Sequence, residues 1–125
     1  MTSDYEVRER TLVLANTCMD GLKHMQWQMH NGYYESSMTL YCDVLDAITH
    51  IERSVQMSID DLDQVERTAG WTAVQEQLFE RLDDLADAYH AGRLHQLPPL
   101  LARLVPVYRL WHNTVHIQLN SNYVV

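Results

Sequence analysis

The pattern of residues 22–59 recurs, loosely, sixty positions later at residues 82–119. The residues identical at this offset are Leu22 and Leu82, His30 and His90, Gly32 and Gly92, Leu40 and Leu100, and Val55 and Val115. Apolar residues on either side of each glycine also recur, stepping mostly by three and four positions as on one face of an α-helix. Each copy therefore predicts two amphipathic helices that turn at a glycine. Two such hairpins bury their apolar faces together, so the predicted fold is an all-α, antiparallel four-helix bundle. A duplicated segment explains the offset, and so do two unrelated hairpins of similar length.

The chain is short enough to be a single domain of 125 residues and long enough to bury its own core. We expect the first hairpin at about residues 4–57 and the second at about residues 59–120. The apolar stripe of the first hairpin consists of Val7, Leu14, Cys18, Leu22, Met25, Met29, Tyr34, Met38, Tyr41, Val44, Ile48, Ile51 and Val55. Apolar residues make up 46% of the chain, an ordinary share for a globular protein.

Local signals predict where the helices of the second hairpin begin and break. Ser58, followed by Asp61, is typical of a helix start, so the third helix is expected to begin there. A break in that helix is expected near Gly70. The fourth helix is expected to begin near Leu94 or at the pair Pro98–Pro99, because proline suits a first helical turn.

The net charge of −8 is distributed unevenly along the chain. Residues 1–59 carry a net charge of −4, residues 60–87 carry −7, and residues 88–125 carry +3 with no acid. An acidic chain repels phosphate backbones, so we expect no nucleic-acid partner. The acidic third helix is able to face the basic fourth, within one chain or between two copies.

A run of acids also allows the chain to act as an acidic inhibitor or nucleic-acid mimic. The residues of this decoy surface would be Asp60, Asp61, Asp63, Glu66, Asp83, Asp84 and Asp87. A solvated helix face is the simpler interpretation of the same acids.

Seven histidines invite a search for a metal site in the bundle. Asp–His pairs with helical spacing occur at Asp20 and His24, Asp46 and His50, and Asp87 and His90. At roughly 100° per residue, these pairs point away from the apolar stripes and into solvent. Only His112 lies near a core edge, so His112 and His116 are the remaining candidate metal ligands. We expect no metal and no cofactor, and keep a metal- or small-ligand-binding bundle as the alternative.

No catalytic motif is present, and we expect no catalytic residues and no enzyme activity. Cys18 and Cys42 lie on or beside the buried stripes, as expected of reduced thiols. A disulfide between them across the first hairpin is the alternative in an oxidising compartment. The N-terminal residues lack the pattern of a signal peptide, and no apolar run approaches the roughly 18 residues of a membrane span. We therefore expect a cytoplasmic protein with no membrane partner.

The fourth helix is more apolar than a helix that buries one face. Its apolar arc spans roughly 200°, against about 100° for an ordinary surface helix. Either the helix is central in the bundle, or its surplus apolar surface contacts a partner. The predicted interface consists of Leu101, Val105, Leu110 and Trp111, with Arg103 and Arg109 as its polar rim.

One resemblance rests on the segment Leu-Asp-Ala-Ile-Thr-His-Ile-Glu at residues 45–52 and on Leu104, Pro106, Tyr108 and Trp111. These residues resemble a small all-helical family of unknown function from Gram-positive bacteria. The resemblance implies a helical bundle and no particular activity. The architecture is also similar to that of flagellar and type III export chaperones, which are small acidic helical proteins that hold a partner's helices.

The expected function is therefore non-enzymatic protein binding. The chain would act as an adaptor or a chaperone-like bundle that binds a partner helix, or a second copy of itself as a homodimer, through the fourth helix.

Overall fold

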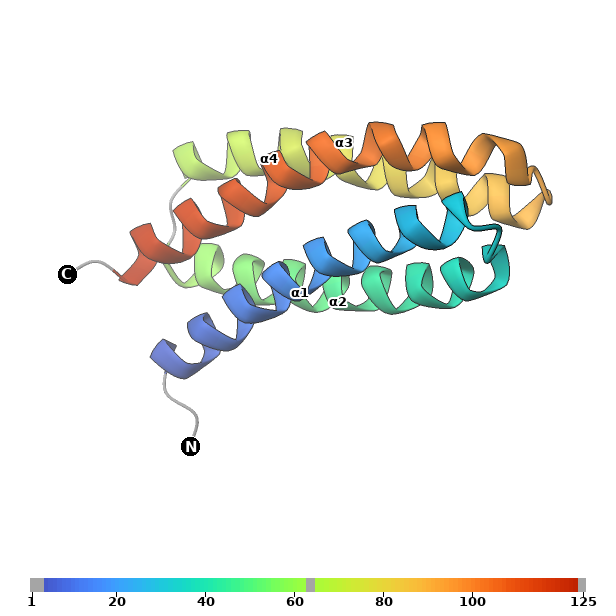
Figure 1. The fold of residues 1–125 in the computed structure, drawn as a ribbon. Helices are drawn as coiled ribbons and strands as arrows, with labels where there is room; N and C mark the ends of the chain where they lie inside the picture. The colour runs from blue at the N-terminus through green and yellow to red at the C-terminus, as the bar shows by residue number, and fades with distance from the viewer. Residues whose placement is uncertain (1–3, 63–64, 124–125) are drawn as a thin grey trace.

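The computed structural model contains four long α-helices arranged as two antiparallel hairpins (Figure 1). It describes the backbone of residues 4–62 and 65–123 and the side chains of residues 5–57 and 70–119. The helices are α1 (Asp4–His30), α2 (Tyr34–Leu62), α3 (Val65–His90) and α4 (Leu97–Tyr123), and a 3-10 turn, Leu94–Gln96, precedes α4. α1 packs against α2 as hairpin one, and α3 packs against α4 as hairpin two. The described backbone contains no strand, and the predicted all-α four-helix architecture is confirmed.

Both hairpins turn in the same way. Gly32 has a φ of 80° and Gly92 a φ of 68°, a left-handed conformation that glycine adopts without strain. After α1, the Tyr33 N–H donates to the Gln28 carbonyl at 2.7 Å and the Gly32 N–H to the Met29 carbonyl at 3.2 Å. The same two bonds close α3, from the residues sixty positions on, at 2.9 and 3.2 Å. This hydrogen-bonding pattern is a Schellman motif, which satisfies carbonyls left free at a helix end.

Two predicted helix boundaries in the middle of the chain are wrong. α2 continues through Ser58 and ends at Leu62, so the predicted cap does not begin α3. α3 runs without a break through Gly70. One glycine costs a helix about 1 kcal/mol, and the burial of Trp71 beside it outweighs that cost. At the fourth helix the prolines fall in the first turn of α4, which begins at Leu97, as expected.

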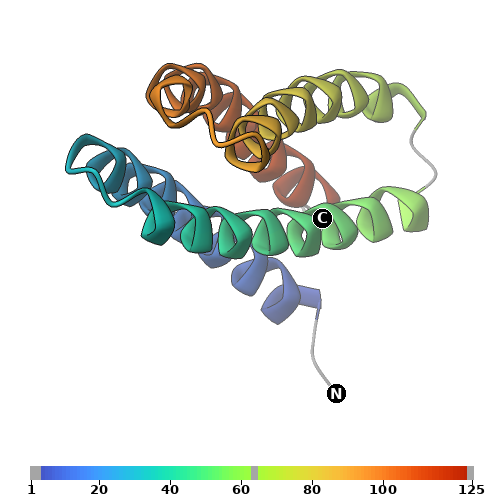
Figure 2. The same ribbon diagram turned by 90° about the vertical axis from the view of Figure 1, so that its right-hand side faces the viewer.

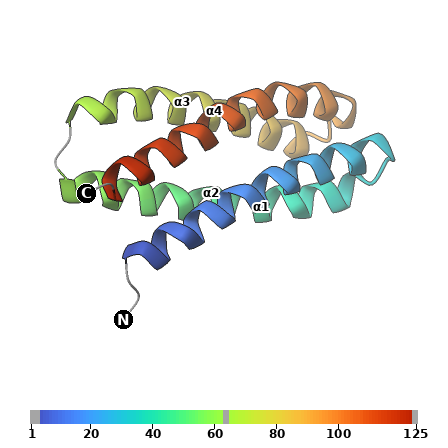
Figure 3. The ribbon, with the colours of Figure 1, turned by 60° about the vertical axis from the view of Figure 1, so that its left-hand side comes forward.

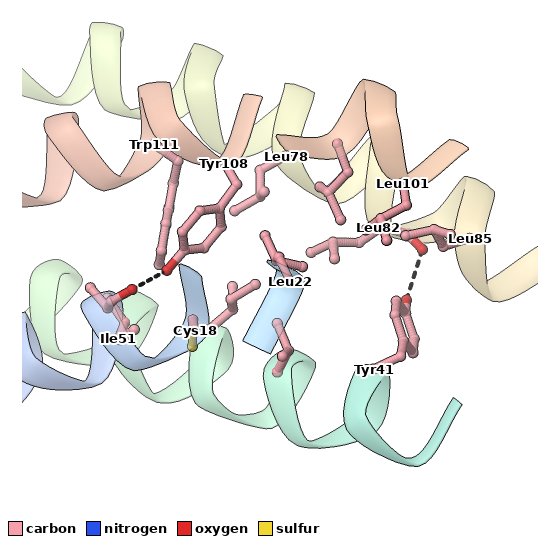
Figure 4. Packing of buried hydrophobic residues seen from close by; sticks show 14 of the residues in the cluster. Cys18, Leu22, Tyr41, Ile51, Leu78, Leu82, Leu85, Leu101, Tyr108 and Trp111 are labelled. Atoms are coloured by element: carbon pink, nitrogen blue, oxygen red, sulfur yellow. Dashed lines mark hydrogen bonds between the residues drawn. The ribbon is translucent and has the colours of Figure 1, made fainter. Parts of the chain in front are cut away.

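The core is built from the same positions of the two hairpins (Figure 4). Pairs sixty residues apart that are both buried include Cys18 and Leu78, Leu22 and Leu82, Met25 and Leu85, Val44 and Leu104, Ile48 and Tyr108, Ile51 and Trp111, and Val55 and Val115. Two predicted stripe residues are exposed instead, Val7 to 39% and Met38 to 45%. Val7 lies in the first turns of α1, which extend away from the other helices (Figures 1 and 3).

Two tyrosines join the hairpins reciprocally. The Tyr41 hydroxyl of hairpin one donates to the Leu82 carbonyl at 2.7 Å (Figure 4). The Tyr108 hydroxyl of hairpin two donates to the Ala15 carbonyl at 2.5 Å. Because both hydroxyls are buried, their hydrogen bonds fix the rotation of one hairpin against the other.

α4 is central in the packing. It contacts α1, α2 and α3, and its C-terminal half lies between α2 and α3 (Figures 1 and 2). This position explains most of the wide apolar arc of the fourth helix, because its neighbours bury Leu101, Leu104 and Trp111, whereas Leu110 and Ile117 stay exposed to 48% and 62%. Within residues 4–62 and 65–123, no helix combines the length and the apolar content that crossing a bilayer requires.

Candidate functional site

The interface predicted on the fourth helix is divided between the core and the surface. Leu101 and Trp111 are fully buried, with 0% exposure, so neither is available to a partner in this fold. Val105 is half-buried, and Leu110 is 48% exposed. Arg103 and Arg109 are exposed on α4. The predicted interface is therefore wrong for Leu101 and Trp111, because α4 buries them inside the bundle, and a contact through Leu110, Arg103 and Arg109 stays a prediction.

An apolar groove lies instead between α1 and α2. A hollow of about 460 Å³ is lined by Leu14, Thr17, Cys18, Asp20, Gly21, His24, Leu40, Asp43, Val44 and Ala47, which we call the hairpin-one groove. Its floor is aliphatic, and its charged lining residues are Asp20 and Asp43, with His24 at the same end. A cation or a hydrogen-bond donor at the end of an apolar segment would therefore suit it.

Gly21 sets how closely the two helices approach beside this groove. A Cβ atom placed on Gly21 would lie 2.9 Å from the Val44 Cγ2 atom, closer than side chains normally pack. Only glycine allows this contact without a shift of the stiff, β-branched valine.

The hollowed surface continues along the N-terminal half of α1. Leu14, which lines the groove, also lines two further hollows of about 260 and 410 Å³. Beside it, Val13 is 61% exposed. The side of α1 that faces solvent carries Glu6, Arg10, Val13, Thr17, Asp20 and His24, all exposed, and we call it the α1 outer face.

An aromatic stack continues the α1 outer face to the turn of hairpin one. The rings of His24 and Trp27 lie 5.7 Å apart, and those of Trp27 and Tyr33 also lie 5.7 Å apart. Trp27 and Tyr33 are each 54% exposed, although such rings are usually more buried. Exposed aromatic rings beside an apolar groove are typical of protein-binding surfaces.

A buried carboxyl group of α2 joins α2 to α3 and α4. Glu52 of α2 is 9% exposed and accepts a hydrogen bond from the Trp111 Nε1–H at 2.6 Å and a short one from the Gln75 side-chain amide. Burial raises the pKa of Glu52, and these two hydrogen bonds oppose that shift in part. The Trp71 ring stacks on Trp111 at 6.2 Å.

Glu52 was not singled out as a site from the sequence, because a charged residue is usually placed on the outside of a helix. Its position next to Ile51, at the edge of the apolar stripe, was the sequence signal that could have indicated its burial. Its partners are neutral donors. No second acid, base or nucleophile is among its hydrogen-bond partners here, so the described contacts support a structural role.

The candidate metal ligands are brought together in a contact with α1. The rings of His112 and His116 lie 4.6 Å apart, and the His112 Nε2 atom lies 2.7 Å from the Asn16 Oδ1 atom. Burial, followed by the neighbouring His116, lowers the pKa of His112. Among the described side chains, no three His, Cys, Asp or Glu residues are placed to hold one ion. The predicted outward direction of the three Asp–His pairs is confirmed, because all six side chains are exposed.

The two cysteines differ in environment. Cys18 is buried, and burial raises its pKa to about 11, so the thiol is protonated and unreactive at neutral pH. Cys42 is exposed, which corrects the prediction that both cysteines lie on or beside a buried stripe. Both are free thiols in this structure.

The acidic surface is described only in part. Asp83 and Asp87 are exposed, and Asp84 lies 3.4 Å from the Arg81 guanidinium group. The side chains of residues 60, 61, 63 and 66 lie outside the described set. The decoy-surface hypothesis therefore stays a prediction.

The fold and the groove define an all-helical protein of two hairpins with an apolar groove on the first. Over residues 6–114 the chain matches the family model described as a domain of unknown function, DUF8042, and it belongs to that family. The matched segment includes both glycine turns and the hairpin-one groove. Comparison with curated proteins and with solved structures found no match. The expectation of a helical domain of unknown function is confirmed.

Proposed function

We propose that this chain is a non-enzymatic protein-binding module, and that its contact surface is the hairpin-one groove together with the α1 outer face. The observation that carries the proposal is the apolar groove, which shares its lining residue Leu14 with two further hollows along α1. A helix or loop with apolar side chains would fill it, as amphipathic helices fill hydrophobic grooves in other proteins.

The surroundings of the groove support a binding role. Its walls are long helices fixed by a packed core, so little conformational freedom is lost when a partner docks. Val13, Trp27 and Tyr33 supply exposed apolar and aromatic area along one side of α1. An adaptor or chaperone-like role in the cytoplasm, as in bacterial export chaperones, is the form of this function that the sequence favours.

Site-specific photo-crosslinking in the native host tests the placement of this surface. A photoreactive residue at Val13 is expected to give a protein adduct, whereas one at the exposed Asn113 of α4 is the control and is expected to give none. A third photoreactive residue is placed at Leu110 of α4. Adducts from Leu110 but not from Val13 would show that the contact surface lies on the fourth helix instead. Absence of adducts from all three positions would contradict the proposal.

A small apolar molecule is a second candidate occupant. The groove volume of about 460 Å³ lies within the range of small-molecule sites. Native mass spectrometry of the freshly purified protein distinguishes this case, because a retained small molecule would appear as a defined extra mass. Replacing Ala47 in the groove wall with Trp would remove it.

A further inference from the structure

The α1 outer face is complementary to itself when it is reversed. Its six residues are Glu6, Arg10, Val13, Thr17, Asp20 and His24. Their positions are symmetric about Ala15, so reversal places Glu6 opposite His24, Arg10 opposite Asp20, and Val13 opposite Thr17. We propose that a second copy of this chain packs antiparallel on α1, with the two-fold axis at the level of Ala15. This inference rests on the proposed function and names the partner of its surface.

The spacing of these residues places them on one side of the helix. Their steps of four, three, four, three and four residues follow the helical repeat, and the face extends over roughly 27 Å at 1.5 Å per residue. All six side chains are exposed in the single chain, so contact with a second copy requires no local unfolding.

Arg10 and Asp20 lie toward opposite ends of the face. Asp20 lines the hairpin-one groove with Asp43, and no lysine or arginine lines that hollow. Arg10 lines the two hollows at the other end of the face. In the antiparallel dimer, Arg10 of the second copy reaches the acidic end of the groove. Symmetry forms this contact twice, as in any isologous interface.

An apolar centre lies between the charged ends. Val13 is 61% exposed and stands two residues from the proposed axis. The antiparallel arrangement packs it on Thr17 of the second copy, beside the half-buried Leu14. Removing Val13 from water in both copies supplies an attraction that the charges alone, near the surface, do not.

The equivalent face of α3 lacks this property. Sixty positions on, the sequence has Glu66, Gly70, Ala73, Gln77, Glu80 and Asp84. These residues include three acids and no base, so an antiparallel pair of α3 helices would repel. The self-complementary pattern is therefore particular to α1 rather than a consequence of the repeat.

Sedimentation velocity over a concentration series of the full chain tests the proposal. We expect a dimer for the wild-type protein. Val13→Glu places a charge at the centre of both halves of the interface and is expected to weaken association at least about 100-fold. Ala73→Glu, at the equivalent exposed position of α3, is the matched control and is expected to leave the dimer unchanged. Thermal unfolding by circular dichroism verifies that both variants remain folded.

A charge exchange tests the orientation. Arg10→Asp and Asp20→Arg are each expected to weaken the dimer roughly 10-fold, since each creates two like-charge pairs. The double variant restores opposite charges and is expected to return the affinity to near the wild-type value. A parallel dimer would not recover in this way.

Several outcomes would overturn the proposal: a monomeric wild-type protein, a dimer that Val13→Glu leaves intact, or a double variant without recovery. A monomer that still forms a Val13 adduct with another protein would refute the dimer and leave the proposed function standing. A monomer without any adduct would refute both.

Discussion

Hairpin one and hairpin two share their turns and their core positions, yet they fill the core differently. In hairpin two, Trp71 and Trp111 stack at 6.2 Å near the end of the bundle opposite the turns. The equivalent residues of hairpin one are Thr11 and Ile51, and these two line a hollow of about 260 Å³. The two tryptophans therefore fill the core of hairpin two at this position. The smaller threonine and isoleucine of hairpin one leave a hollow at the surface.

The outer surfaces differ in the same sense. Trp27 and Tyr33 of hairpin one correspond to Asp87 and Arg93 of hairpin two. The exposed Val13 corresponds to Ala73. Burial in a shared core constrains both hairpins alike, whereas the surface is free to diverge. On hairpin one the exposed apolar and aromatic side chains include Val13, Trp27 and Tyr33, whereas on hairpin two they include Leu94, Leu110 and Ile117, at positions that do not correspond to those three.

The largest expected effect comes from truncating one core residue at the same position of each hairpin. Trp111→Ala removes two ring contacts and a donor to Glu52 and is expected to lower the free energy of unfolding by about 4 kcal/mol. Ile51→Ala, at the equivalent position, is expected to cost about 3 kcal/mol. Urea unfolding measures both. A greater loss for Ile51→Ala would contradict the view that hairpin two closes the core.

A second contrast concerns two titrating residues that are also sixty positions apart. Glu52 of α2 contacts hairpin two, and His112 of α4 contacts Asn16 of hairpin one. Burial raises the pKa of Glu52 and lowers that of His112, so both neutral forms are favoured in the fold. The contribution of Glu52 to stability is fully present below about pH 4.5 and is lost as pH rises through the raised pKa. That of His112 is present above about pH 6.5 and is lost as pH falls toward its lowered pKa.

Replacing Glu52 with Gln removes its charge and keeps one acceptor oxygen for the Trp111 N–H, while the Gln75 amide must turn over to accept from the new NH2 group. Glu52→Gln is expected to raise the free energy of unfolding at pH 7 on the order of 1 kcal/mol, with the difference vanishing at acidic pH. Glu52→Ala leaves the Trp111 N–H without its acceptor and is expected to cost about 2 kcal/mol. Urea unfolding at several pH values measures both effects. A Glu52→Gln variant with an unchanged pH profile would show that the carboxyl group titrates normally.

The sequence pattern within each helix was enough to predict the turns and the buried positions of the bundle. The turns at Gly32 and Gly92 followed from glycine at the end of an apolar stripe, and the buried positions followed from the helical period. These features depend on residues near in sequence, which is why they could be predicted.

The site depended on how the helices are placed in space. Whether Leu101 and Trp111 face a partner or the core is decided by the number of neighbours around α4, which no single helix reveals. The groove depends on the close approach of α1 and α2 at Gly21. The inward direction of Glu52 depends on donors contributed by α3 and α4.

Substitution of the two turn glycines tests whether the turns are equivalent in energy as well as in shape. Gly32→Ala and Gly92→Ala each force a Cβ atom into the left-handed conformation, at a cost of about 1.5 kcal/mol. We expect equal losses in thermal unfolding, because both turns make the same hydrogen bonds and a methyl group at either position would have no neighbour within 4 Å. Losses that differ by more than about 1 kcal/mol would show that the aromatic residues beside Gly32 contribute to its turn.

The two helical glycines provide the smallest and sharpest contrast, because alanine is expected to have opposite effects at the two positions. Gly70 of α3 is exposed, and a Cβ atom there meets nothing within 4 Å. Gly70→Ala is therefore expected to stabilise the protein by about 0.8 kcal/mol through helix propensity alone. At Gly21 the same gain is opposed by a contact of 2.9 Å with Val44, and a net loss of roughly 0.5 kcal/mol is expected. Val44→Ala removes the Cγ2 methyl group that a Cβ atom on residue 21 would meet. The double variant Gly21→Ala with Val44→Ala is therefore expected to be no less stable than Val44→Ala alone. If Gly21→Ala stabilised the protein as much as Gly70→Ala does, α1 and α2 would not be held together as closely as this packing requires, and the floor of the hairpin-one groove would be adjustable rather than fixed.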